Sequence, residues 1–295
     1  MGRYAEKGTN VKSEEMNDKN VKGKGNKRIR DGIEILLNAL IFAFTLLGIG
    51  IMLHRNGNDG GLLSSSGWEN FKYFTVLSNV FCGIVAGVYL VTWGLRKKGK
   101  TRSMHNDGKI DTAEPMTERQ KGRAAEEKDE MAVEGKDGPT AIWTRESRAL
   151  CPVWLMVLKL AAAAGVMVTF LVVACFFGPL YTYPVLYRGS NLWFHLIIPL
   201  LGMVEFCLLD GEIPFRMTFL TGAPALVYGC FYMGNILING KGQWPDTNDW
   251  YGFVNWGWGP AMVIFACIVL TNWGAACLLR WLNHVIHKAL NGNFK

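Results

Sequence analysis

The sequence lacks the features that mark a disulfide scaffold, a cysteine-based zinc protein or a GxSxG serine hydrolase. Its seven cysteines all lie in or beside apolar runs, no CxxC pair occurs, and no GxSxG motif is present. Disulfides, a zinc site and the nucleophile elbow of α/β hydrolases are therefore not predicted. The first thirty residues are polar and basic, which is too long and hydrophilic for a typical cleaved signal peptide. No metal ion and no cofactor is predicted.

Charge is also scarce within six long apolar runs, although 19% of the 295 residues are charged. A helix needs about 20 apolar residues to cross the hydrocarbon core of a bilayer. The sequence therefore predicts an all-α fold, a polytopic membrane helix bundle with six transmembrane helices, and an integral multi-pass membrane protein in contact with membrane lipids. The predicted spans are Ile33–Leu53, Phe74–Leu95, Trp154–Gly178, Leu192–Asp210, Phe215–Ile238 and Trp258–Leu282.

Basic residues are distributed unevenly along the chain. Residues 1–32 contain nine Lys and Arg residues, and residues 96–150 contain thirteen. The loops on the other side of the predicted membrane carry few, among them Arg55, Arg188 and Lys241. By the positive-inside rule both termini are predicted to be cytoplasmic, and an even number of spans agrees with this. The net charge of +7 is thus mainly a topology signal, and no nucleic-acid partner is predicted.

The polar segments divide the chain. Residues 96–150 combine basic and acidic residues with scattered Gly and Pro, a composition that buries too little apolar surface to offset chain entropy. We predict, in order, a disordered basic cytoplasmic segment (1–32), transmembrane helices 1–2 (33–95), a disordered charged cytoplasmic loop (96–150), transmembrane helices 3–6 (151–283) and a cytoplasmic tail (284–295).

The second span begins with a polar face at its extracytoplasmic end. Thr75, Ser78 and Asn79 are three and four residues apart, so they share one side of a helix. His195 lies near the extracytoplasmic start of the fourth span. At 1.5 Å per residue, Thr75 and His195 both lie about 5 to 8 Å below the outer boundary. The sequence therefore predicts that a hydroxyl and an imidazole share one layer of the bundle.

This layer has two interpretations. In the first, His195 is the general base for Thr75, which attacks an acyl carbon. Asn79 or Asn235 then orients the imidazole or stabilises the oxyanion. In the second, the same side chains only hydrogen-bond within and between helices. The candidate substrate-binding residues around Thr75 and His195 are Ser78, Asn79, Tyr232, Asn235 and Trp244.

Trp244 belongs to an aromatic loop, Gln243–Trp258, that precedes the sixth span. Trp and Tyr gather at membrane surfaces, so one interpretation of this loop is anchoring at the interface. The other is a lid over a pocket in the outer leaflet. The sequence leaves both open.

Two opposite charges lie at matching depth in the cytoplasmic half. Lys159 is about five residues into the third span, and Glu205 is about five residues from the end of the fourth. Neither charge is tolerated alone in hydrocarbon. We therefore predict that Lys159 and Glu205 form a structural ion pair.

Three stretches together resemble the androgen-induced family of multi-span membrane proteins. They are "FKYFTVLSN", then "NLWFH" with a proline four residues on and an acidic residue ten residues on, then "VYGCFYMGN" followed by "GQWP". The resemblance covers residues 71–253 without the charged loop. It implies threonine hydrolases that cleave esters of a fatty acid with a hydroxy fatty acid. The implied nucleophile falls on Thr75 and the implied base on His195.

The chain departs from the animal members of that family at Ser78, where they carry an acidic residue, and so looks nearer to the microbial branch. For that branch the resemblance implies no established substrate. The sequence thus predicts a membrane-embedded hydrolase of fatty-acyl lipid esters. The alternative is a non-enzymatic protein that binds or transports a lipid or a small amphiphile. The oligomeric state is left open.

Overall fold

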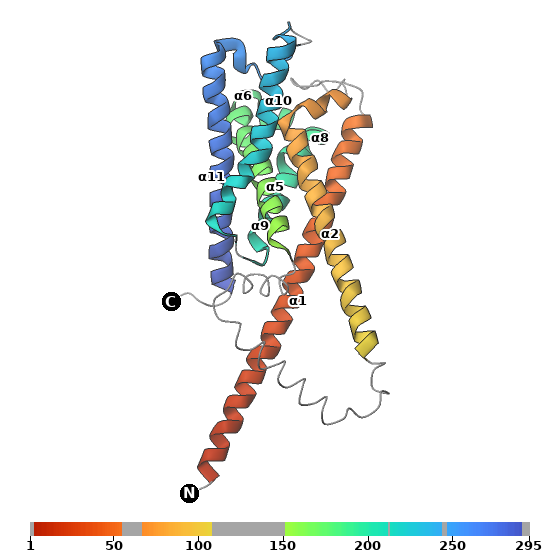
Figure 1. The fold of residues 1–295 in the computed structure, drawn as a ribbon, viewed down its shortest axis with the longest axis vertical. Coiled ribbons are helices and arrows are strands. Elements are labelled where there is room, and N and C mark those ends of the chain that lie inside the picture. The colour runs from red at the N-terminus through yellow and green to blue at the C-terminus, as the bar shows by residue number, and fades with distance from the viewer. Residues whose placement is uncertain (1–2, 55–66, 108–150, 212, 244–246, 291–295) are drawn as a thin grey trace, which may run out of the picture.

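The computed structural model describes residues 3–54, 67–107, 151–211, 213–243 and 247–290, and these form an all-helical bundle. The first long helix is α1 (Arg3–His54), and the second is α2 (Phe74–Asp107), preceded by the short turn η1 (Gly67–Lys72). Figure 1 shows that α1 enters and α11 finishes at the same end of the bundle, which we call the terminal end. The opposite end is called the loop end.

The remaining elements complete four more spans. The third is α5 (Val153–Leu171), followed by the π-helical η2 (Val172–Phe177) and α6 (Gly178–Tyr181). After the short helix α7 (Tyr183–Leu186), the fourth span is α8 (Ser190–Leu192), the π-helical η3 (Trp193–Ile197) and α9 (Ile198–Leu208). The fifth is η4 (Phe215–Gly222) with α10 (Ala223–Asn239), and the sixth is α11 (Trp258–Leu290) after the short turn η5 (Phe253–Trp256).

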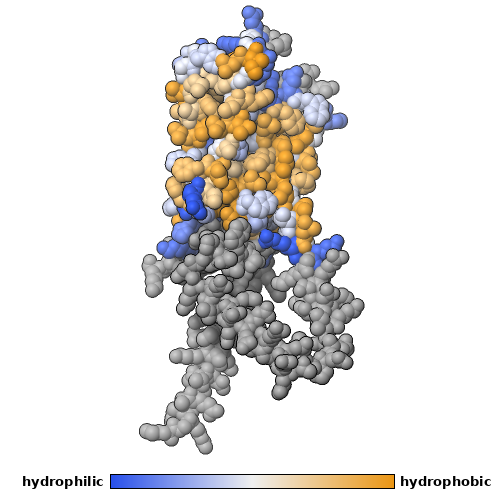
Figure 2. All heavy atoms as spheres, in the orientation of Figure 1, coloured by the Kyte–Doolittle hydropathy of each residue, from blue (hydrophilic) through white to orange (hydrophobic). Residues whose placement is uncertain are grey.

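Six helical stretches are long and apolar enough to cross a membrane. They are Ile29–His54, Phe74–Lys98, Val153–Leu180, Ser190–Leu208, Phe215–Asn239 and Trp258–Leu290. Their outward side chains are apolar; Ile84, Val227 and Leu237, for example, are 57%, 69% and 68% exposed. Figure 2 shows the resulting apolar band, with hydrophilic residues at both ends of the bundle. The chain is an integral multi-pass membrane protein, and this surface contacts lipid.

The polar flanks differ in part from the prediction. Residues 3–32, predicted to be disordered, continue α1, and residues 96–107 of the predicted charged loop continue α2. Both extensions lack proline, and a helix that is already nucleated adds residues without a new nucleation cost. The helix α11 likewise runs on to Leu290 in the predicted tail. Residues 108–150 and 291–295 lie outside the described residues.

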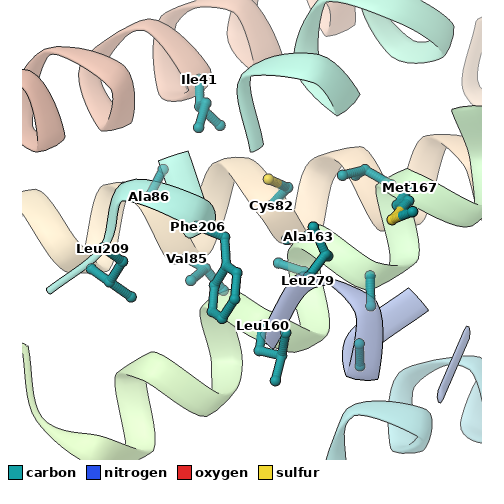
Figure 3. Packing of buried hydrophobic residues seen from close by; sticks show 14 of the residues in the cluster. Ile41, Cys82, Val85, Ala86, Leu160, Ala163, Met167, Phe206, Leu209 and Leu279 are labelled. Atoms are coloured by element: carbon teal, nitrogen blue, oxygen red, sulfur yellow. The ribbon is translucent and has the colours of Figure 1, made fainter. Parts of the chain in front are cut away.

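The helix α5 forms the centre of the bundle and is buried along most of its length. Its middle carries four consecutive alanines, Ala161–Ala164, which let neighbouring backbones approach closely. The α1–α2 contact uses the same device, because a Cβ placed on Gly83 would lie 2.6 Å from the side chain of Thr45. Figure 3 shows apolar side chains of α2, α5, α9 and α11 meeting in this core. Close packing of small residues therefore holds the spans together.

Candidate functional site

His195 lies in a π-helical turn that Pro199 explains. In η3 the backbone N–H of Ile198 donates to the carbonyl of Trp193, five residues back, rather than to that of Phe194. The next residue in this pattern is Pro199, which has no N–H to give to the carbonyl of Phe194. The turn therefore leaves the Phe194 carbonyl without a backbone partner, directly beside His195.

Asn79 of α2 supplies the hydrogen-bond donor that the Phe194 carbonyl lacks. Its amide nitrogen Nδ2 donates to the Phe194 carbonyl at 2.9 Å and to the Thr75 carbonyl at 2.7 Å. The carbonyls of Thr75 and Phe194 thus share one nitrogen as donor, which places the Thr75 turn of α2 against the His195 turn of η3. The structure brings together the two turns that the sequence placed at one depth.

His195 itself is buried, with 7% of its surface exposed. Its Nδ1 lies 3.1 Å from the carbonyl of Leu186, the last residue of α7, where a helix leaves its carbonyls without intrahelical partners. A carbonyl only accepts, so Nδ1 carries the hydrogen and Nε2 of the neutral imidazole is an acceptor. This tautomer is the one a general base needs.

Thr75 is half-buried near the start of α2. Among the described residues, its hydroxyl makes no hydrogen bond to His195 or to any other group, whereas its carbonyl accepts from Ser78 and Asn79. The hydroxyl is therefore not committed to back-bonding within its own helix.

The other predicted substrate-binding residues have different surroundings. The hydroxyl of Ser78 is buried and lies 3.3 Å from that of Thr169 on α5, inside the bundle. Both amide hydrogens of Asn79 are used by backbone carbonyls, so this residue does not donate to an oxyanion. Its oxygen Oδ1 is buried and accepts no hydrogen bond from the residues that the structure describes, so it remains an acceptor.

Tyr232 and Asn235 have their hydrogen-bond partners in the aromatic loop and in α10. The hydroxyl of Tyr232 donates to the carboxylate of Asp249, and the side chain is almost fully buried. Asn235 bonds to Asn248 at 3.2 Å and to Asn239 at 2.8 Å, which holds the loop to α10. The amide nitrogen of Asn235 therefore already has a hydrogen-bond partner in the loop, and its oxygen has one in α10. Trp244 lies outside the described residues.

The aromatic loop packs as a cap on the start of α2. We call the cluster of Tyr228, Tyr232, Trp250, Tyr251 and Phe253 the aromatic cap. The hydroxyl of Tyr251 accepts from the backbone N–H of Phe74 at 2.8 Å, and the hydroxyl of Tyr228 donates to the Lys72 carbonyl at 2.7 Å. Burial raises the pKa of Tyr251 well above its usual range, so this hydroxyl stays protonated. The cap thus contacts the residues on either side of Tyr73, next to Thr75.

Tyr228, Asp249 and Tyr251 were not singled out from the sequence. The aromatic loop was recognised, but its folded path depends on specific contacts such as the Tyr232–Asp249 hydrogen bond. A pocket of about 540 Å³ opens beside the cap and is lined in part by Lys241, Gln243, Thr247, Asp249, Trp250 and Asn255. This volume is within the range of small-molecule sites.

A second polar layer lies nearer the terminal end. Lys159 and Glu205 form the ion pair that their matching depths predict, and both side chains are at most 5% exposed. Asn38 of α1 joins them: its Oδ1 accepts from Lys159 Nζ at 2.6 Å, and its Nδ2 donates to Glu205 Oε1 at 2.8 Å. The ammonium also lies 4.1 Å from the centroid of the Tyr89 ring. Lys159 Nζ and Glu205 Oε1 therefore both have close polar partners.

Glu34 extends this layer and was missed by sequence reasoning, because it stands only one residue inside the predicted first span. It is 1% exposed, and its carboxyl accepts from the Tyr89 hydroxyl at 2.8 Å and from the Asp210 backbone N–H at 3.2 Å. A cavity of about 10 Å³ beside Lys159 and Glu205 is the size of one water molecule. Among the described residues, no group of three or more His, Cys, Asp or Glu side chains is arranged to hold a metal ion.

Comparison with protein-family models, with curated proteins and with solved structures found no match to this chain. Function is therefore argued from the geometry of the two layers.

Proposed function

We propose that the protein is a membrane-embedded hydrolase of fatty-acyl lipid esters, with Thr75 as nucleophile and His195 as general base. The observation that carries the proposal is the contact of His195 Nδ1 with the Leu186 carbonyl at 3.1 Å, which assigns the hydrogen to Nδ1 and leaves Nε2 as an acceptor in the layer of an uncommitted threonine hydroxyl. The resemblance to the androgen-induced family points to the same two residues. The positive-inside rule places this layer below the extracytoplasmic surface.

The chemistry follows from these roles. Nε2 of His195 takes the proton of the Thr75 hydroxyl while its oxygen attacks the ester carbonyl carbon. The tetrahedral intermediate collapses, the alcohol leaves with the proton from His195, and an acyl ester remains on Thr75. Water, deprotonated by His195, then releases the fatty acid and restores the threonine hydroxyl. Since Asn79 does not donate to the oxyanion, the positive end of the α2 dipole is the nearest stabilising element.

A substrate dissolved in the bilayer suits this location, because it reaches the layer laterally from the lipid. A soluble ester must first enter from water. The aromatic cap covers the start of α2 and so shields the reacting groups on the aqueous side. We expect esters with long acyl chains to be preferred over short soluble esters.

The test is turnover of a lipid-ester panel by the purified protein. Thr75→Val and His195→Gln are expected to lower kcat/KM by about a hundredfold or more, while Thr75→Ser retains part of the activity. The matched controls are Thr92→Val, a half-buried threonine on the same helix, and His284→Gln, an exposed histidine at the terminal end. A fluorophosphonate probe is expected to label Thr75. Unchanged turnover in both site variants would exclude Thr75 and His195 as the catalytic pair, and absence of turnover in the wild type would exclude the hydrolase.

A second candidate is non-enzymatic binding of a small amphiphile. The pocket of about 540 Å³ beside the aromatic cap favours it, since polar and aromatic groups line one cavity. Binding of a fluorescent fatty acid by the wild type and by Thr75→Val alike, with no ester turnover by either, would support this candidate over the hydrolase.

A further inference from the structure

Among the described side chains that are buried near the terminal end, acidic groups outnumber basic ones. The acids of the polar layer at this end are Asp31 and Glu34 of α1 with Glu205 and Asp210 at the end of the fourth span. The cations that pair with these acids are Lys159 of α5 and Arg30 of α1. Further titratable or charged groups nearby are Tyr89 and Arg96 of α2, Cys151, and His287 of α11. His287 approaches Arg30 at 3.5 Å and the Leu209 carbonyl at 2.7 Å. Among the described residues of this layer, the buried charged groups are two carboxyl groups, Glu34 and Glu205, and one cation, Lys159.

Both cations, Lys159 and Arg30, already form ion pairs with acidic side chains. Lys159 pairs with Glu205 and Asn38, as described above. Arg30 pairs with Asp210 at 2.6 Å, and these two side chains are 20% and 40% exposed, so they border the water at the terminal end. Among the described residues, no cation lies within ion-pair distance of Glu34. Asp31 is only half-buried, whereas Glu34 is 1% exposed. Glu34 is therefore the least exposed of the four carboxyl groups, and it has no described cation within ion-pair distance.

A buried carboxylate without a cation is costly, and such a group takes up a proton instead. Glu34 accepts two hydrogen bonds: the Asp210 N–H donates to Oε1 at 3.2 Å, and the Tyr89 hydroxyl donates to Oε2 at 2.8 Å. A carboxylic acid keeps both bonds, because its carbonyl oxygen and its hydroxyl oxygen can each accept. Protonation therefore removes the buried charge without breaking either contact.

We propose that Glu34 is a proton-binding site inside the membrane, which takes its proton from hydronium at the terminal end and returns it there through the Arg30–Asp210 border. Asn38 connects this site to the buried ion pair. Its Nδ2 donates both to the backbone carbonyl of Glu34 at 2.7 Å and to the carboxylate of Glu205. Loss of the proton puts a second negative charge beside the single positive charge of Lys159. The site is independent of the proposed hydrolase.

The experiment is infrared spectroscopy of the full chain in lipid nanodiscs, titrated from neutral to alkaline pH. A buried protonated carboxyl has a C=O stretching band separate from the carboxylate bands. We expect this band in the wild type at neutral pH, its loss in Glu34→Gln, and its retention in Glu69→Gln, which removes an exposed acid at the loop end. Absence of the band in the wild type, or its persistence in Glu34→Gln, would overturn the assignment.

A second variant keeps the proposal testable if Glu34→Gln does not fold. Tyr89→Phe removes the hydrogen-bond partner of Glu34 Oε2, so it should shift the frequency of the band without abolishing it. Tyr183→Phe, at an exposed tyrosine, should leave the band in place.

Thermal unfolding gives an independent readout. Glu34→Gln mimics a neutral acid and should leave Tm unchanged, whereas Glu205→Gln strands Lys159 and should lower Tm by several degrees. A fall of Tm in Glu34→Gln as large as that in Glu205→Gln would contradict a neutral Glu34.

Discussion

The two polar layers of this bundle differ in how fully their groups are paired. In the layer near the terminal end, Lys159, Glu205 and Asn38 satisfy one another. In the layer near the loop end, His195 keeps one nitrogen available and the Thr75 hydroxyl makes no hydrogen bond among the described residues. Buried networks that are complete fix a structure. Groups left available in a membrane interior are instead candidates for chemistry.

The comparison therefore predicts opposite sensitivities. Substitutions of the paired groups Lys159, Glu205 and Asn38 should lower stability, and substitutions of the available groups Thr75 and His195 should lower function while stability changes little. Three variants at groups with hydrogen-bond or ion-pair partners measure the first half of this division, in order of the expected loss in free energy of unfolding. All three can be measured by unfolding in mixed micelles of a mild detergent and SDS.

Lys159→Met should have the largest effect. It leaves the Glu205 carboxylate buried without its cation, which costs about 3–5 kcal/mol of unfolding free energy. The double variant Lys159→Met with Glu205→Leu should recover most of that loss, because an apolar pair replaces the ion pair. Arg188→Met, at an exposed cation, is the control. If the single variant is no less stable than the double one, the ion pair does not fix the structure.

Asn79→Leu should come second. It removes the donor that serves the Phe194 carbonyl, which Pro199 leaves without a backbone partner. Leaving a buried carbonyl unsatisfied costs about 1–3 kcal/mol. The control is Asn239→Leu, at an exposed asparagine on α10, with an expected change within about 0.5 kcal/mol. Equal losses in the two variants would show that the contact between α2 and η3 contributes little.

Tyr251→Phe should have the smallest effect, about 1 kcal/mol, because it removes one hydrogen bond to the Phe74 N–H at the rim of the bundle. Its effect should be local. Hydrogen exchange at residues 73–76 is expected to speed up, while exchange in α5 stays the same. Acceleration throughout the bundle would mean that the aromatic cap is part of the global fold rather than a cover over the start of α2.

Much of the fold is predictable because long apolar runs are an unambiguous signal. All six predicted spans occur, and the largest difference is at the end of the sixth, which runs to Leu290 instead of Leu282. The Lys159–Glu205 pair was also accessible, since depth in a bilayer can be counted along a helix and a lone charge demands a partner. Depth alone does not give the direction in which a side chain points, however. For this reason Glu34, placed at the membrane boundary by counting, was not recognised as a member of the same network.

The loop end was harder to predict. Tyr232 and Asn235 were assigned by depth to the Thr75 layer, but the structure gives them partners in the loop, Asp249 and Asn248. Loop conformation has no periodicity that a sequence reveals, so these contacts were not foreseeable. The bond from Asn79 to Phe194 was equally hidden, because it depends on a backbone carbonyl exposed by a π-helical turn.

That turn makes Pro199 and Asn79 a compensating pair, although 120 positions separate them along the chain. The proline withholds a backbone hydrogen, and the amide of the neighbouring helix replaces it. If Pro199 alone is replaced, the backbone can supply its own N–H and the Asn79 amide is no longer needed. If Asn79 alone is replaced, the Phe194 carbonyl loses its hydrogen-bond donor. Pro199 and Asn79 are therefore expected to be kept together or replaced together in evolution. Replacement of both would also change the orientation of the His195 ring, because His195 lies in the same turn.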